Sequence, residues 1–464
     1  MIKAGFYECD ITPPLGTECP GGFTKRLIKV ICDALKVRAV VFDDGKRKVA
    51  LVGIDTIGAG PLFRKKVEEL LPDFEVIMSA SHTHSGGNLR DPFPNQEKLP
   101  PDVLENMRTE LTFHDADYYN SCLKQVVTAV TLAAERVEEV DFSFGRGRVD
   151  NLIFNRRISM KDGTALTHPG KGNPENADYA GPVDNELGAM GLWKKGTDKL
   201  LGCVINFSCH ACINLEGASS DFPGVAVNAV KGVFGPETGV VYINGASGDV
   251  TQIDNLSLKK DTGKRIAYKL GRTVGGEAVK VLANADRGEC STLRVLKGDL
   301  TLERKKLDAE KVAEAYKHAG KDDPEFARCR WLITRDFTYK ANPSPVETLR
   351  VIQIGPLLIG SSSGEMFAQY ALDFKAASRF PFTWYSQLAS DQLGYVPSPD
   401  CFKEGRGGYE TVNARFAPDT GTKVINLLLS LAKDLTPDPA PQPILVERVT
   451  EAWSANGDRT AKKK

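Results

Sequence analysis

Residues 75–87 read Glu75-Val76-Ile77-Met78-Ser79-Ala80-Ser81-His82-Thr83-His84-Ser85-Gly86-Gly87, a short apolar run followed by a polar cluster with two histidines. The same order recurs at residues 201–210, where an apolar run leads into Asn206-Phe207-Ser208-Cys209-His210. Apolar runs of this length, bounded by turn-forming residues, indicate buried strands. Because histidines held at the ends of rigid strands can bind a catalytic metal, the two stretches predict a sheet with a metal site at its edge.

Three further apolar runs end in polar or acidic residues in the same way. In parallel or mixed sheets such strand ends open onto one ligand crevice. The runs are residues 49–54 before Asp55, residues 240–243 before Asn244–Asp249 and residues 357–360 before Ser361–Glu365.

Helices are predicted between these strands, where apolar residues recur at three- and four-residue spacing. The sequence therefore predicts an α/β fold, in which a mixed, largely buried β-sheet is flanked by helices and the active site lies at the strand carboxyl ends. The predicted helices cover residues 61–71, 117–138, 262–283, 308–319 and 366–376.

The chain is predicted to form one catalytic domain over residues 1–435, since this part shows no internal repeat and no linker composition. Residues 436–443 contain four prolines, so residues 436–464 are expected to form a Pro-rich C-terminal arm with a frayed tail. Within the domain, residues 162–179 are rich in Gly, Pro, Asn and Lys, and predict a long loop that could cover the site.

The amino-acid composition limits the classes of molecule that the protein is expected to bind. Sixty basic residues balance sixty acidic ones, so the net charge argues against nucleic acid and favours a small-molecule substrate. No apolar run approaches the roughly 18 residues of a spanning helix, and no stable membrane association is expected. The first residues lack the apolar stretch of a secretory signal, and the ten cysteines show no framework spacing, so a cytoplasmic location is expected. A homo-oligomer is compatible with the sequence.

Other chemistry-bearing motifs are weak or absent. Cys209 and Cys212 form a C-x-x-C around His210, but no second pair completes a four-cysteine zinc site. No dinucleotide or P-loop glycine pattern occurs. Gly245-Ala246-Ser247-Gly248 has only two residues between its glycines, which is not a nucleophile elbow. A serine triad is therefore not expected, and water activated by a metal is the better nucleophile.

Taken together, the motifs resemble the neutral/alkaline (non-lysosomal) ceramidase superfamily, specifically its N-terminal catalytic domain. The resemblance follows the order of the chain over roughly residues 1–430, which makes chance similarity of the weak single motifs improbable. The motifs are Asp10-Ile11-Thr12-Pro13-Pro14-Leu15-Gly16, Ser81–Gly86, Asn155-Arg156-Arg157, Gly181-Pro182-Val183-Asp184, His210, Asn244–Val250, Gly364-Glu365 and the region of Tyr395 and Tyr409.

The resemblance implies a Zn²⁺ cofactor held by two histidines, a glutamate and a tyrosine, which are His82, His210, Glu365 and Tyr395 here. Whether His82 or His84 is the direct ligand stays open. Side chains two apart on an extended segment point the same way, so one could bind the metal and the other the substrate.

The resemblance also assigns catalytic roles. Arg156 matches an active-site arginine, and His84 and Tyr409 are expected to donate hydrogen bonds to the developing oxyanion or to protonate the leaving group. Arg156 could instead grip a substrate carboxylate. Asp249 is expected to orient a ligating histidine or a loop backbone. Thr251 stands where ceramidases carry a serine regarded as catalytic, so a hydroxyl is kept but with a stiffer rotamer.

Ceramidases continue into an immunoglobulin-like domain and commonly carry secretion signals, neither of which is found in this sequence. A small soluble amide is therefore expected in place of ceramide. The predicted function is a zinc-dependent hydrolase that cleaves an N-acyl bond by metal-activated water.

Two alternatives remain. One is a zinc-dependent lyase, or an esterase or lactonase, that acts on a carboxylate-bearing or sugar-like substrate gripped by Arg156 and Arg157. The other is a non-catalytic binding protein on the same scaffold. Water consumption separates hydrolase from lyase, and metal analysis with an activity screen tests the binding protein.

Overall fold

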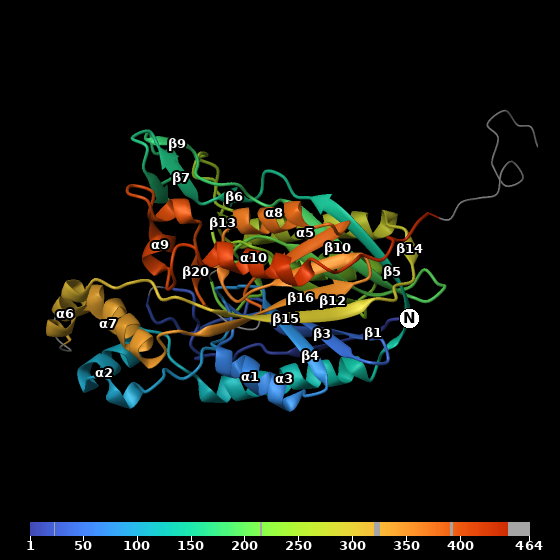
Figure 1. Ribbon diagram of the computed structural model, residues 1–464, viewed down its shortest axis with the longest axis horizontal. Coiled ribbons are helices and arrows are strands. Elements are labelled where there is room, and N and C mark those ends of the chain that lie inside the picture. The colour runs from blue at the N-terminus through green and yellow to red at the C-terminus, as the bar shows by residue number, and fades with distance from the viewer. Residues whose placement is uncertain (23, 214–215, 320–324, 390–392, 444–464) are drawn as a thin grey trace, which may run out of the picture.

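The computed structural model describes residues 1–22, 24–213, 216–319, 325–389 and 393–443. Two β-sheets share one apolar core, and helices cover their outer faces (Figure 1). The predicted α/β class, with a largely buried mixed sheet flanked by helices, is confirmed. No helix among the described residues is both long and apolar enough to cross a bilayer.

The larger sheet has nine strands in the order β12-β11-β10-β5-β1-β2-β3-β4, with β14 also paired to β5. Its pairs are antiparallel except β3 with β4 and β11 with β12, which are joined by helices as β-α-β units. The sheet curls, so that β12 at one end contacts β2, β3 and β4 at the other. The strands are β1 (Lys3–Asp10), β2 (Lys36–Asp43), β3 (Lys48–Ile54), β4 (Phe74–Ala80), β5 (Glu138–Arg148), β10 (Glu186–Lys194), β11 (Leu200–Phe207), β12 (Gly239–Asn244) and β14 (Arg287–Gly288).

The smaller sheet has the order β15-β16-β17-β19, in which β17 and β19 run parallel. Three minor sheets, β6 with β13, β18 with β20, and β8-β7-β9, join loops around the strand ends. These strands are β15 (Leu293–Thr301), β16 (Val346–Ile354), β17 (Leu357–Ser361), β19 (Phe382–Ser386), β6 (Phe154–Asn155), β13 (Val250–Thr251), β18 (Glu365–Met366), β20 (Tyr395–Val396), β7 (Arg157–Met160), β8 (Ala165–Thr167) and β9 (Asn176–Tyr179).

Helices α1 and α3 pack on the β1–β4 half of the larger sheet, and α4 and α5 on its β10–β12 half. Helices α8 and α10 cover the smaller sheet, while α2, α6 and α7 form a separate small core at one end (Figure 1). The helices are α1 (Pro61–Leu70), α2 (Pro101–Glu110), α3 (Ala116–Ala134), α4 (Asp221–Phe234), α5 (Lys264–Asn284), α6 (Ala309–Lys317), α7 (Phe326–Ala341), α8 (Ala368–Ala377), α9 (Tyr409–Asn413) and α10 (Thr420–Ala432), with 3-10 turns at Gln96–Lys98 and Pro399–Phe402.

All five predicted strands are present, as β3, β4, β11, β12 and β17, and so are the five predicted helices, as α1, α3, α5, α6 and α8. The helix predicted over residues 117–138 ends early at Ala134, because the chain turns there to begin β5 at Glu138. The long loop predicted over residues 162–179 is wrong in part, since it forms β8 and β9, which pair with β7.

After α10, residues 435–443 form neither helix nor strand. Asp438 accepts hydrogen bonds from Ser291 and Thr292, and the Gln353 side chain donates to the Thr436 carbonyl oxygen (2.7 Å). The start of the arm is thereby tied to the smaller sheet. Residues 444–464, and with them the predicted frayed tail, lie outside the described residues.

Candidate active site

The carboxyl ends of strands from both sheets meet at one place. The Asn244 N–H, at the end of β12, donates to the Ser79 hydroxyl near the end of β4 (3.3 Å). The Gln387 N–H, just after β19, donates to the Asn244 carbonyl oxygen (3.0 Å). The loops that carry His82 and His84, His210 and Glu365 follow the carboxyl ends of β4, β11 and β17, as the sequence predicted.

His82 has a left-handed backbone just before the turn at His84 and Ser85, and not the extended backbone that was expected. Its φ is 63°, in the left-handed region, which costs a non-glycine residue about 1–3 kcal/mol. Buried surroundings hold this conformation, since the His82 side chain is almost wholly enclosed. The turn still brings His82 and His84 together, with their Nε2 atoms 3.4 Å apart.

Each of the three clustered histidines contacts a backbone carbonyl through Nδ1. The His82 Nδ1 lies 2.7 Å from the Ile57 oxygen, and the His210 Nδ1 lies 2.5 Å from the Ser247 oxygen. A carbonyl only accepts, so Nδ1 carries the proton and the Nε2 lone pair of a neutral ring faces the site. His84 does the same with the Gly21 oxygen (2.9 Å).

Glycine is required at two positions around these rings. Gly21 has φ +100°, and a Cβ there would lie 2.8 Å from the His84 ring. Gly248 lets the loop after β12 approach β18, because a Cβ there would lie 2.3 Å from the Glu365 carbonyl oxygen. The Gly248 N–H donates to the Met366 oxygen at 2.7 Å, which fixes this approach.

Glu365 completes the cluster from the side of the smaller sheet. Its Oε2 lies 3.3 Å from the Nε2 of His82 and 3.3 Å from that of His210. The same Oε2 is buried and has no hydrogen-bond donor. Residues of β18 and β20 pair in register, Glu365 with Tyr395, so the tyrosine hydroxyl comes within 3.5 Å of the His210 Nε2.

This donor set fits one metal ion. A carboxylate oxygen between two imidazole lone pairs is stable only with a cation among them. Metal–ligand bonds of about 2.0–2.1 Å in a tetrahedron place the donor atoms about 3.3–3.4 Å apart, which matches the separations observed. His82 is buried and lies 3.3 Å from Glu365, whereas His84 is partly exposed.

The electrostatics agree with neutral rings around an ionised carboxylate. Burial, together with Arg156, lowers the pKa of His210 to about 4. Burial also lowers the pKa of His84 well below its ordinary value. Burial alone would raise the pKa of Glu365, but His82 and His210 hold it well below its usual range. At neutral pH the site therefore presents a carboxylate and at least two neutral imidazoles.

Arg156 and Arg157 form a brace with one buried carboxylate. Arg156 Nε donates to Glu410 Oε1 (2.7 Å) and Arg157 Nη1 donates to Glu410 Oε2 (3.1 Å). The other Arg157 nitrogen, Nη2, donates to the carbonyl oxygens of Arg406 and Gly407, so Arg157 is fully engaged. The alternative in which both arginines grip a substrate carboxylate is therefore not supported.

Arg156 differs from Arg157 because one of its guanidinium nitrogens has no hydrogen-bond partner. Nη1 lies 3.4 Å from the His210 Nε2, and Nη2 is buried without a hydrogen-bond partner. The guanidinium also lies over the rings of Tyr395 and Tyr409, 5.1 and 5.8 Å from their centroids. Although burial opposes it, Tyr395 and Glu410 raise the pKa of Arg156 well above its ordinary value, so the group stays charged.

Tyr409 is the outermost of the predicted site residues, with 38% of its surface exposed. Its ring centroid lies 5.5 Å from that of Tyr395. Partial burial raises the pKa of the Tyr409 hydroxyl, so it remains protonated at neutral pH. Tyr409 and His84 are thus the two groups at the open side that can exchange a proton.

Asp249 and Thr251 lie beside the cluster. Asp249 accepts from the Asn155 side chain (2.7 Å) and from the Ala368 N–H at the start of α8 (2.9 Å). Both of these contacts go to the Asn155 amide and to backbone at the start of α8, and neither goes to a histidine. Thr251 donates to the Gln252 side chain (2.9 Å), so its hydroxyl is engaged away from the imidazoles.

Three residues that support the site were not predicted from the sequence. Glu410 braces both arginines, the His168 N–H donates to the Arg156 carbonyl oxygen, and Gln387 holds the loop of Ser247 through two hydrogen bonds. Glu410 and Gln387 act on partners more than 100 positions away, which no local pattern reveals. Thr167 also donates to Glu410 (2.6 Å), so the segment predicted as a covering loop does contact this region.

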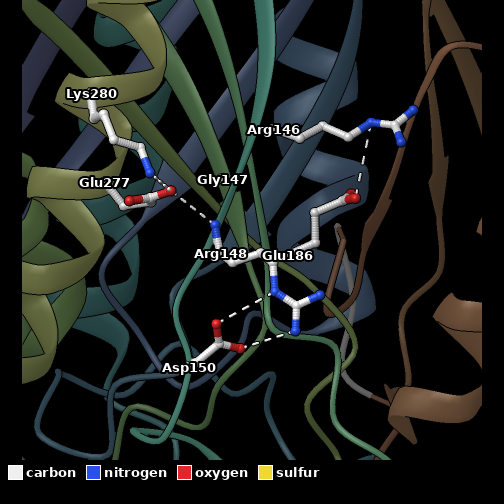
Figure 2. Close-up of a pocket in the computed structure, with 7 residues that line it drawn as sticks. All are labelled: Arg146, Gly147, Arg148, Asp150, Glu186, Glu277 and Lys280. Atoms are coloured by element: carbon white, nitrogen blue, oxygen red, sulfur yellow. Dashed lines mark hydrogen bonds and ion pairs between the residues drawn. The ribbon is translucent and has the colours of Figure 1, made fainter.

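A second charged region lies elsewhere on β5 and α5, in a cavity of about 540 Å³ (Figure 2). We refer to it as the paired cavity, because its cations and anions pair with each other. Arg148 pairs with Asp150 (3.1 Å), Lys280 with Glu277 (2.6 Å) and Arg146 with Glu186 (3.9 Å). Its lining residues are Arg146, Gly147, Arg148, Asp150, Glu186, Glu277 and Lys280, none of which belongs to the histidine cluster.

Comparison with known proteins bears on the fold. No family model matches the sequence, and no curated protein matches it significantly. The structure is similar to that of a ceramidase complexed with C2, with a TM-score of 0.70 and 16% identity over 95% of this chain and 77% of that chain. It is also similar to a neutral ceramidase from Pseudomonas aeruginosa, with a TM-score of 0.67 and 15% identity over 95% and 76% of the two chains. The chain therefore has the fold of the neutral ceramidases, as its motifs predicted.

Proposed function

We propose that the protein is a zinc-dependent hydrolase that cleaves the amide bond of a small N-acyl substrate. The observation that carries this proposal is the buried Glu365 Oε2, which faces the Nε2 atoms of two imidazoles without a donor of its own. Similarity to ceramidase structures supports the choice of an amide. The metal would be held by His82, His210, Glu365 and Tyr395, with His84 beside it.

A zinc ion in such a site supplies a nucleophilic hydroxide near neutral pH and polarises the carbonyl under attack. The chain's own groups do the rest. The unpartnered Arg156 Nη2 is a charged donor that can stabilise a developing oxyanion in a dry environment. Glu410 holds Arg156 in place through Nε and leaves Nη2 free for that role.

Proton transfer falls to the two groups on the open side. His84 is held in one tautomer by the Gly21 oxygen, so its Nε2 can accept a proton from the nucleophile. Tyr409 is protonated and partly exposed, so it can donate a proton to the leaving amine. The engaged hydroxyl of Thr251 makes it a poor nucleophile in this arrangement.

The test is metal content and turnover of the full chain with matched histidine variants. We expect about one zinc per chain in the wild type by plasma mass spectrometry, and turnover of N-acyl substrates that stops on chelation and returns with Zn²⁺. His210→Ala should lose metal and activity, whereas His318→Ala, at the C-terminal cap of α6, should keep both.

Full zinc occupancy in His210→Ala would refute the proposed ligand set. A panel of N-acyl amines, matched esters and lactones then identifies the bond, since preferred turnover of the esters would replace an amidase by an esterase. Metal binding without turnover of any member would favour the binding-protein alternative.

A further inference from the structure

Two arginines near the site have no carboxylate partner. Arg90 follows the histidine loop and Arg415 follows α9, and both side chains are exposed. Within the described ranges, neither forms an ion pair or donates a side-chain hydrogen bond. This differs from the paired cavity, where Arg146 and Arg148 each have an acidic neighbour (Figure 2).

Arg415 lies against the backbone that carries a proposed metal ligand. A Cβ at Gly394 would lie 3.5 Å from the Arg415 Nε. Gly394 directly precedes Tyr395, and its carbonyl oxygen accepts the Glu365 N–H at 2.9 Å. The Arg415 side chain therefore packs one residue away from the donor cluster.

Arg90 approaches the same place from the other side of the chain. Its charge interacts with those of Arg415, Glu18 and Glu365. Glu18 is already engaged, since it pairs with Lys25 (2.5 Å) and accepts the Phe113 N–H (2.5 Å). Glu365 belongs to the donor cluster. Among the described residues, Arg90 and Arg415 thus interact electrostatically with each other, and neither has an acidic partner in an ion pair.

The region behind Arg415 adds positive charge. Arg304 and Arg335 both interact electrostatically with Arg415. Arg304 donates to the Asn342 carbonyl oxygen (3.0 Å) and Arg335 to that of Val412 (2.8 Å), so their bonds go to neutral acceptors.

We propose that Arg90 and Arg415 bind an oxyanion of the substrate, so that the preferred substrate is an acidic N-acyl compound with a carboxylate or sulfonate a few bonds from the scissile amide. Arginine suits this role because its planar fork binds such groups with two parallel hydrogen bonds. The identity of the scissile bond rests on the proposed function, but the anion site rests on Arg90 and Arg415 alone.

Calorimetric titration of the zinc-loaded full chain tests this without requiring turnover. The probes are N-butanoylglycine, N-butanoyltaurine, N-ethylsuccinamate and the neutral N-butanoylethanolamine. Glycine and taurine place a carboxylate or a sulfonate on the amine side, and succinamate places a carboxylate on the acyl side. We expect at least one anionic probe to bind about 10- to 100-fold more tightly than the neutral one.

Three glutamine variants identify the residues. Arg90→Gln and Arg415→Gln should each remove most of the anionic preference and leave the weak neutral binding unchanged. Arg146→Gln, an equal charge change in the paired cavity, should bind as the wild type does. All three side chains reach solvent, so the fold should be kept.

Equal binding of neutral and anionic probes, or an unchanged preference in both Arg90→Gln and Arg415→Gln, would overturn the proposal. Selective anion binding without hydrolysis of any probe would refute the amidase and leave the anion site standing. Hydrolysis without a preference for the anionic probes would refute the anion site and leave the amidase standing.

Discussion

The histidine cluster and the paired cavity of Figure 2 both gather several charged or titratable side chains, yet they differ in how these groups are satisfied. In the cavity, exposed cations pair with exposed or partly buried anions, and ion pairs that reach water contribute little to stability. In the cluster, the buried Glu365 Oε2 and Arg156 Nη2 have no hydrogen-bond partner. Unsatisfied buried groups are costly, so they indicate a place where a ligand belongs.

The largest effect should come from Glu365→Gln, which keeps the shape and removes the charge. We expect zinc affinity to fall by at least about 100-fold, more than is typical for a residue that only orients a ligand. Competition with a chromophoric chelator measures it. Glu277→Gln in the paired cavity is the matched control, and its zinc affinity should equal that of the wild type. An equal loss of zinc affinity in both variants would show that the histidine cluster is not the zinc site.

Glu410→Gln should have the next largest effect, on folding. It removes the one carboxylate that pairs with both buried arginines, Arg156 and Arg157, and removing one partner of a buried pair typically costs about 3–5 kcal/mol. Urea unfolding of the metal-free chain measures the free energy of unfolding. Asp150→Asn breaks an exposed pair and should leave the unfolding midpoint unchanged. A small effect of Glu410→Gln would show that this brace is not structurally important.

Asp249 should make stability depend on pH. Burial raises its pKa to about 6 from the ordinary 3.8, so the folded chain takes up the proton first as pH falls. Its contribution is full below about pH 4 and is lost as pH rises through 6, a change of about 3 kcal/mol.

Urea unfolding of metal-free wild type and Asp249→Asn at several pH values checks this. The stability difference, wild type minus variant, should decrease between pH 4 and pH 7. If the difference is constant with pH, the pKa of Asp249 is not raised.

Thr251→Ala should have the smallest effect. Because the Thr251 hydroxyl donates to Gln252, its loss should reduce kcat less than tenfold, comparable to the loss of one neutral hydrogen bond. Thr251→Ser serves as the control, since it keeps the hydroxyl without the methyl group. A decrease of several hundredfold in Thr251→Ala, rescued by serine, would instead make this hydroxyl part of the chemistry.

Strand positions were predictable because each apolar run is bounded by turn residues, and the strand ends carry the site in both sheets. The helix α4 was missed because it is apolar on most faces and contains Pro223 and Gly224 in its first turns. Buried helices lack the polar face on which a periodic pattern depends. The division of strands between two sheets depends on pairing across long separations, which local sequence does not contain.

The site was predictable as a set of residue types but not as a geometry. His82, His210, Glu365 and Tyr395 do come together. The choice between His82 and His84 needed the left-handed turn at His82, and the sequence pointed wrongly to an extended segment. The carbonyl oxygens that set the tautomers, such as those of Ile57 and Ser247, have no side-chain signature and could not be predicted.

The left-handed backbone at His82 has a practical consequence. Glycine adopts φ near 63° freely, whereas other replacements would keep the strain after losing the ring. The variant His82→Gly should thus keep the surrounding residues in place and leave a cavity the size of one imidazole. Free imidazole added to the buffer should enter that space, so the variant offers a way to switch the centre on chemically by small-molecule complementation.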